Sequence, residues 1–159
     1  MADLYRQDTD STKKALKRYK KNKDVIQWLY ERRSRLVARI ESLKSPGISD
    51  MPKGGDHRSK EDLIAEKVDI ERRIQKYKDK GVRIKSEITD MIDTLDDRHE
   101  AEVLERYLIY CQDFGEIADA MGYTERHVIR LYTSAVTKIA QVKHETVTKI
   151  AQVKHETVS

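Results

Sequence analysis

Two long stretches of this chain place apolar residues at steps that alternate four and three, and this spacing most limits how the chain can fold. It is the heptad spacing of helices that pack side by side. Residues 45–58 separate the stretches and hold both prolines and three of the six glycines, which break helices. The first stretch repeats at Ala15, Tyr19, Asn22, Ile26, Leu29, Arg33, Leu36, Ile40 and Leu43. The second repeats at Leu63, Lys67, Ile70, Ile74, Tyr77, Gly81, Ile84, Ile88, Met91 and Leu95.

We therefore expect an all-α protein. A first helix is predicted over residues 12–44 and a second over residues 59–94, with a loop over 45–58 and a loose polar segment over 1–10. Only 38% of the residues are apolar and another 38% are charged, which suits long exposed helices better than one large core.

The two predicted helices are similar in length, and the loop between them is long enough to reverse the chain. We expect an antiparallel hairpin, coiled-coil-like, with Leu43 near Leu63 and Ala15 near Met91 or Leu95. The second helix would then deliver the rest of the chain beside the start of the first helix.

Residues 113–133 read as two short helices joined by a tight turn. Gly122 stands where the first must end, because glycine accepts the left-handed backbone of a sharp turn. Thr124 can cap the second helix. Apolar residues recur at helical spacing on both sides of the turn: Ile117, Ala118, Met121, Val128 and Leu131.

This spacing is typical of a helix-turn-helix, whose second helix enters the DNA major groove. An ordinary helical hairpin with a glycine cap would show the same pattern. In the DNA-binding interpretation the domain spans residues 95–140, and Arg126 and Arg130 lie one turn apart, where each can contact a guanine edge. We call the exposed side chains of the second helix the recognition face: Thr124, Glu125, Arg126, His127, Arg130 and Thr133.

The residues around the turn resemble region four of bacterial sigma factors, which reads the promoter −35 element. The resemblance covers about Leu95 to Ile139. It is carried by the turn and by flanking segments, namely Leu95-Asp96-Asp97-Arg98, Val103-Leu104, Arg106-Tyr107, Ala135-Val136 and Ile139.

Charge is unevenly distributed along the chain. Residues 1–44 carry 13 basic and 6 acidic side chains, whereas residues 96–136 carry 4 and 9. The hairpin would bring a basic helix end close to the acidic head, where it can supply salt-sensitive affinity for phosphates; a solvated helix end is the alternative. The predicted phosphate contacts are Lys13, Lys14, Lys17, Arg18, Lys20 and Lys21. The acidic Glu100, Glu102 and Glu105 either face away from DNA or contact a basic surface on RNA polymerase.

The segment Ser-Pro-Gly-Ile-Ser-Asp-Met-Pro-Lys-Gly at 45–54 resembles a loop of small phage regulators of Gram-positive bacteria, of the RinA and ArpU type. The layout of the whole chain is similar to theirs. This resemblance implies an activator of phage late genes that acts at double-stranded promoter DNA with host RNA polymerase.

No constellation of residues indicates an enzyme, and nothing points to a cofactor. The single Cys111 fits a reducing cytoplasm and a small core position. No run reaches the roughly 18 apolar residues of a membrane span, and the first residues lack the apolar stretch of a secretory signal. His144 and His155 lack cysteine partners, so no metal site is expected.

Residues 137–147 recur unchanged as residues 148–158. Eleven residues make three helical turns, so the repeat can extend the last helix with one apolar stripe. The stripe can serve in self-association, or the second copy can be a dispensable duplication.

Two other functions fit the same pattern. A terminase small-subunit-like adaptor for phage DNA packaging also joins a helix-turn-helix to coiled helices, but it forms a ring. A protein-interaction module would bind polymerase or a repressor without DNA, and the acidic stretch 96–136 favours it.

Overall fold

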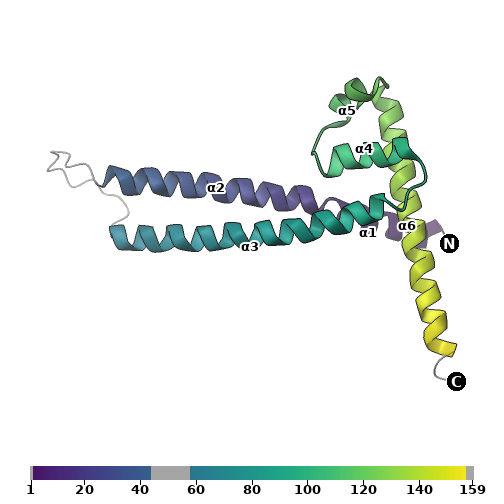
Figure 1. The fold of residues 1–159 in the computed structure, drawn as a ribbon, viewed down its shortest axis with the longest axis horizontal. Coiled ribbons are helices and arrows are strands. Elements are labelled where there is room, and N and C mark those ends of the chain that lie inside the picture. The colour runs from purple at the N-terminus through teal and green to yellow at the C-terminus, as the bar shows by residue number, and fades with distance from the viewer. Residues whose placement is uncertain (1, 44–57, 157–159) are drawn as a thin grey trace. The chain divides into compact units, whose positions relative to one another are not determined.

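The computed structural model describes residues 2–43 and 58–156. Within these ranges six α-helices follow one another, joined by short turns (Figure 1). They are α1 (Ala2–Leu16), α2 (Arg18–Ser42), α3 (Lys60–Ile92), α4 (Arg98–Leu108), α5 (Phe114–Met121) and α6 (Glu125–Glu156). The predicted loop, with its phage-regulator-like segment, lies almost wholly outside the described residues. No helix in the described ranges is long and apolar enough to cross a membrane.

The described helices form two compact units. One is residues 22–82, and the other combines residues 1–21 with residues 83–159. Each unit has its own cluster of buried apolar side chains.

In the first unit, α2 and α3 lie side by side in opposite directions (Figure 1). Six apolar side chains form its core: Leu29, Leu36, Ile40, Leu63, Ile70 and Ile74. Each stands at a position of the heptad spacing. Partly buried Val25, Tyr30 and Tyr77 pack against this core.

Polar residues within the spacing pair across the two helices. The amide nitrogen of Asn22 donates to the backbone carbonyl of Tyr77 at 3.0 Å. Arg33 forms an ion pair with Glu71 at 3.1 Å, and Arg32 forms one with Glu66. The residue that comes earliest in α2, Asn22, meets the one that comes latest in α3, Tyr77. This order of contacts is the register of two antiparallel helices.

The start of the chain differs from the prediction. Residues 1–10 were expected to be loose and residues 12–44 to be one helix, but α1 begins at Ala2 and the helix is interrupted at Lys17. Leu16 is fully buried and Thr12 is 3% exposed, because α1 packs against α6. A long-range contact of this kind is invisible to a heptad pattern, so the pattern was extended too far toward the N-terminus.

The second unit is built around one larger core. Leu16 shares it with Ile84, Ile88 and Ile92 at the end of α3, and with apolar residues of α4, α5 and α6. Three aromatic rings from distant positions meet in it: Tyr107 stacks on Phe114 at 4.7 Å, and Tyr132 meets both edge-on. Burial raises the pKa of Tyr132 to about 12, so its hydroxyl stays protonated.

Candidate nucleic-acid interface

Helix α5 is fixed at both ends by its own sequence. At its start Asp113 accepts from the backbone N–H of Glu116 at 2.8 Å, and Glu116 accepts from the backbone N–H of Asp113 at 2.9 Å. This reciprocal pair is a capping box. At its end Gly122 has φ 68° and ψ 33°, the left-handed conformation that glycine adopts without steric cost.

Helix α6 begins directly after this turn. Thr124 accepts from the backbone N–H of His127 at 3.3 Å, as expected for a residue that caps a helix. Ile117, Ala118 and Val128 are 0%, 4% and 0% exposed, so the two helices bury their facing sides. The other side of the first turns of α6 is left open.

The residues predicted for the recognition face lie on this open side. Thr124, Glu125, Arg126, Arg130 and Thr133 are exposed, and His127 is half-buried. The hydroxyl of Thr133 donates to the backbone carbonyl of Ile129 at 2.8 Å, so it is already engaged within the helix.

Sequence reasoning missed Ile129. It is 41% exposed although it is apolar, and it stands on the same face as Arg126, Arg130 and Thr133 at helical spacing. An apolar side chain in this place can contact the methyl group of thymine. Its spacing was readable from the sequence, but it resembles a core position until the buried side of α6 is known.

The predicted phosphate contacts belong to the same compact unit as α5 and α6. Lys14, Lys17 and Lys21 are exposed. The other three are engaged within the protein. Lys13 lies 4.0 Å from Asp10, Arg18 pairs with Glu87 at 2.7 Å, and the Lys20 ammonium lies 5.8 Å from the ring centre of Tyr107.

Glu100, which was expected either to face away from DNA or to contact a basic surface on RNA polymerase, lies inside the protein. It is 4% exposed. Its carboxylate accepts from Ser134 at 2.7 Å and from the Lys138 ammonium at 2.8 and 2.9 Å. This carboxylate therefore ties α4 to α6 and is not available for DNA or polymerase.

The same contact raises the pKa of Lys138, chiefly through the hydrogen bond to Glu100. A raised folded-state pKa stabilises the protein below the ordinary lysine value of 10.5 and loses that effect as the pH rises through the raised value.

At the start of α4, Asp97 accepts from the backbone N–H groups of Glu100 and His99, which lowers its pKa.

Replacing Lys138 by methionine is expected to lower the melting temperature, because the buried carboxylate of Glu100 then keeps only Ser134 as a partner. The double variant Glu100→Gln with Lys138→Met should recover most of the loss, since it leaves no buried charge. Thermal unfolding at pH 7.5 checks both. Above about pH 10.5 the wild type should approach the Lys138→Met variant in stability. Equal melting of all three proteins at pH 7.5 would show that the pair is not structural.

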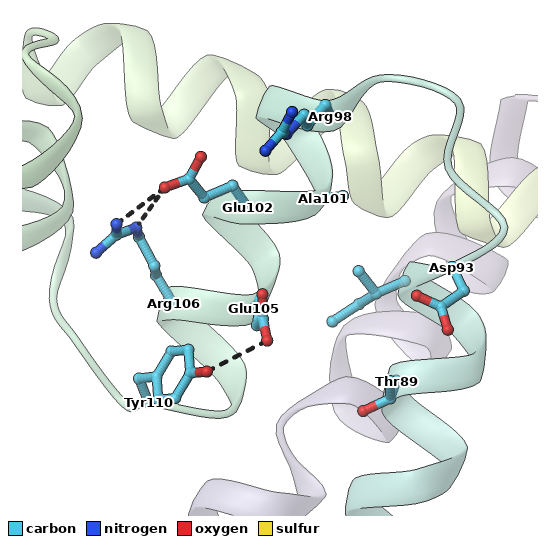
Figure 2. A pocket seen from close by; sticks show the side chains of 9 residues that line it. Thr89, Asp93, Arg98, Ala101, Glu102, Glu105, Arg106 and Tyr110 are labelled. Carbon is cyan, nitrogen blue, oxygen red and sulfur yellow. Dashed lines mark hydrogen bonds and ion pairs between the residues drawn. The ribbon is translucent and has the colours of Figure 1, made fainter.

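A cavity of about 500 Å³ opens between the end of α3 and one side of α4. Figure 2 shows Thr89 and Asp93 on one wall and the side chains of α4 on the other. The lining residues are Thr89, Ile92, Asp93, Arg98, Ala101, Glu102, Glu105, Arg106 and Tyr110. Arg106 pairs with Glu102 at 2.9 Å, and the Tyr110 hydroxyl lies 3.4 Å from Glu105 (Figure 2). Glu102 and Glu105, the acidic residues of α4 besides Glu100, thus line a cavity together with the exposed ring of Tyr110.

The model of a protein family described as "Protein of unknown function (DUF1492)" matches residues 42–141. These residues include α3, α4, α5 and the first half of α6. No curated protein and no solved structure is similar enough to the chain to count as a match.

Proposed function

We propose that this chain, which belongs to the DUF1492 family, is a DNA-binding transcription regulator whose α5 and α6 act as a helix-turn-helix. The observation that carries the proposal is the α5–α6 pair. A capped short helix, a left-handed glycine and a buried crossing hold α6 so that one side of its first turns is open. In a helix-turn-helix that side faces the base edges of the major groove.

The chemistry of the recognition face supports base readout. An arginine can make two hydrogen bonds to a guanine, and an exposed isoleucine can pack on a thymine methyl group. Glu125 can accept from a cytosine amino group, although at the start of α6 it also favours the helix dipole. The resemblance to sigma region four points to promoter DNA and host RNA polymerase as partners. The resemblance to phage late-gene activators points to phage late genes as the genes that the chain regulates.

The proposal is tested by selecting duplexes from a random DNA pool with the full chain. An enriched motif that binds tighter than its shuffled version supports sequence-specific DNA binding. Absence of binding at low salt would favour a module that acts through protein contacts alone. A particle of about eight or more protomers in solution would favour a DNA-packaging adaptor.

The exposed lysines of the N-terminal segment are expected to contribute affinity without specificity. Changing Lys14, Lys17 and Lys21 together to glutamine should weaken binding to selected and shuffled duplexes equally. It should also reduce the slope of log K against log salt by about one unit for each lysine that contacts a phosphate. Arg18 is left unchanged because it pairs with Glu87.

The matched control changes Lys60, Lys76 and Lys80, three exposed lysines of α3. This variant should keep the wild-type slope. If both triple variants flatten the slope by the same amount, the N-terminal lysines have no special place on DNA.

A second candidate function is contact with a basic protein surface through the cavity beside α4. Asp93 and Glu105 are the carboxylates there that make no ion pair in the part of the chain that the structure describes, and Tyr110 is 62% exposed. A lysine or arginine side chain of RNA polymerase that entered the cavity would contact these carboxylates and the ring of Tyr110 together. This function can accompany DNA binding, because the recognition face lies on α6.

A further inference from the structure

A row of polar contacts runs from the recognition face to α4. An Nη nitrogen of Arg130 lies 3.1 Å from Nδ1 of His127. The His127 ring meets the Tyr123 ring edge-on at 4.7 Å and 76°. The Tyr123 hydroxyl lies 3.2 Å from Nδ1 of His99, at the start of α4.

The contact between Arg130 and His127 requires one particular protonation state of the imidazole. A guanidinium can only donate hydrogen bonds, so Nδ1 of His127 must be the acceptor. An imidazole that accepts at Nδ1 is neutral and carries its proton on Nε2. The contact between Arg130 and His127 therefore exists only while His127 is uncharged.

His127 is the more firmly held member of the pair. It is half-buried, and the Tyr123 ring lies edge-on to its ring, whereas Arg130 is exposed. Tyr123 is held in turn by His99, through the hydroxyl contact and an edge-on ring contact at 6.0 Å. A half-buried imidazole thus contacts a long flexible side chain, and such a contact reduces the entropy that the side chain loses on binding.

We infer that His127 is a positioning residue, which holds the guanidinium of Arg130 in place for base readout and makes DNA discrimination sensitive to acid. The inference rests on the proposed DNA-binding function. It changes the part assigned to His127 from the sequence, which was a direct DNA contact. The bond to His127 uses one of the five N–H donors of Arg130, so a pair remains for a guanine edge.

Acid should reverse the contact. Histidine side chains ordinarily change charge between about pH 5 and 8. A second proton on His127 turns Nδ1 into a donor and places two cations side by side. In the part of the chain that the structure describes, this imidazole meets Arg130 on α6 and Tyr123 in the turn, and His99 of α4 lies one contact further. On α5, Glu116 is engaged in its own capping box. The released Arg130 and the added charge should raise affinity for any phosphate backbone and lower discrimination between sequences.

The test uses the full chain, the duplex that the wild type selects from a random pool, and a shuffled duplex of the same composition. The measured quantity is the ratio of the two dissociation constants at pH 7.5 and at pH 5.5. His127→Leu removes the acceptor. His127→Asn keeps an acceptor oxygen near Nδ1 and does not titrate. His144→Leu is the matched control, because it makes the same change at an exposed position later in α6.

At pH 7.5 the ratio of dissociation constants for His127→Leu is expected to fall by about fivefold, which is part of the discrimination that one bidentate arginine–guanine pair contributes. His127→Asn should keep most of the ratio and show no change with pH. The wild type and His144→Leu should lose ratio at pH 5.5 while their affinity for the shuffled duplex rises. In an Arg130→Ala background, His127→Leu should change the ratio no further, because the histidine acts through that arginine.

The outcomes separate the inference from the function on which it rests. If the wild type selects no duplex, the proposed DNA binding and the positioning role of His127 are both wrong. If it selects one but His127→Leu keeps the ratio, or lowers it equally in the Arg130→Ala background, the positioning role is wrong. A wild-type ratio that is the same at both pH values overturns the acid response without needing any variant to fold.

Discussion

Leu29→Asp is expected to unfold the pair formed by α2 and α3. Leu29 is fully buried in a core to which the described residues contribute six apolar side chains, and a buried charge without a partner costs well over what one side chain gains on burial. We expect a loss above about 4 kcal/mol, in the range that marks severe core defects. Far-UV circular dichroism should show lost helix at 25 °C.

The single Trp28 provides a local probe of the same change. It is 45% exposed and lies 5.7 and 5.9 Å from the guanidinium groups of Arg32 on α2 and Arg73 on α3. Its fluorescence should shift toward that of a free tryptophan in Leu29→Asp. Ser34→Asp, at an exposed position of the same helix, should leave both signals unchanged. Melting of both variants at the wild-type temperature would contradict the packing of α2 on α3.

Arg126→Ala and Arg130→Ala are each expected to lower affinity for the selected duplex by about tenfold, because a good bidentate arginine–guanine pair gives roughly 1–3 kcal/mol of discrimination. Affinity for a shuffled duplex should fall much less, since only phosphate attraction is lost there. Binding to both duplexes across a salt series measures the difference.

The matched control for these two variants is Arg72→Ala. Arg72 is an exposed arginine of α3 that lies 3.5 Å from Asp69. It should change neither affinity. If the two α6 variants lose affinity for both duplexes in equal proportion, they touch phosphates and do not read bases.

Much of the fold follows from local patterns in the sequence. All six core residues of the α2–α3 pair stand at heptad positions, and Gly122 and Thr124 take the local structures predicted for them. The limits of α3 are also within two residues of the prediction. These features depend on residues close in sequence, where periodicity and capping chemistry act directly.

Features that depend on distant contacts could not be read in this way. The packing of α1 on α6 joins segments more than a hundred residues apart, and Glu100 is buried where Lys138 and Ser134 meet it from α6. The ring cluster of Tyr107, Phe114 and Tyr132 draws on three helices. None of these leaves a periodic trace in the sequence.

Parts of the candidate site did leave local signals in the sequence. Asp113 and Glu116 have the three-residue spacing of a capping box. His127 and Arg130 have the spacing at which helical side chains meet. The spacing could have suggested the pair, but the half-burial of His127 and its contact with the Tyr123 ring depend on the fold.

Reading of DNA by the recognition face of α6 can be tested by selection from a random duplex pool with the full chain, followed by titration of the selected and shuffled duplexes at several salt concentrations. We expect an enriched motif, a tighter complex with the selected duplex at every salt concentration, and loss of that preference in Arg126→Ala and Arg130→Ala. No enrichment, together with equal or absent binding of both duplexes at low salt, would contradict it.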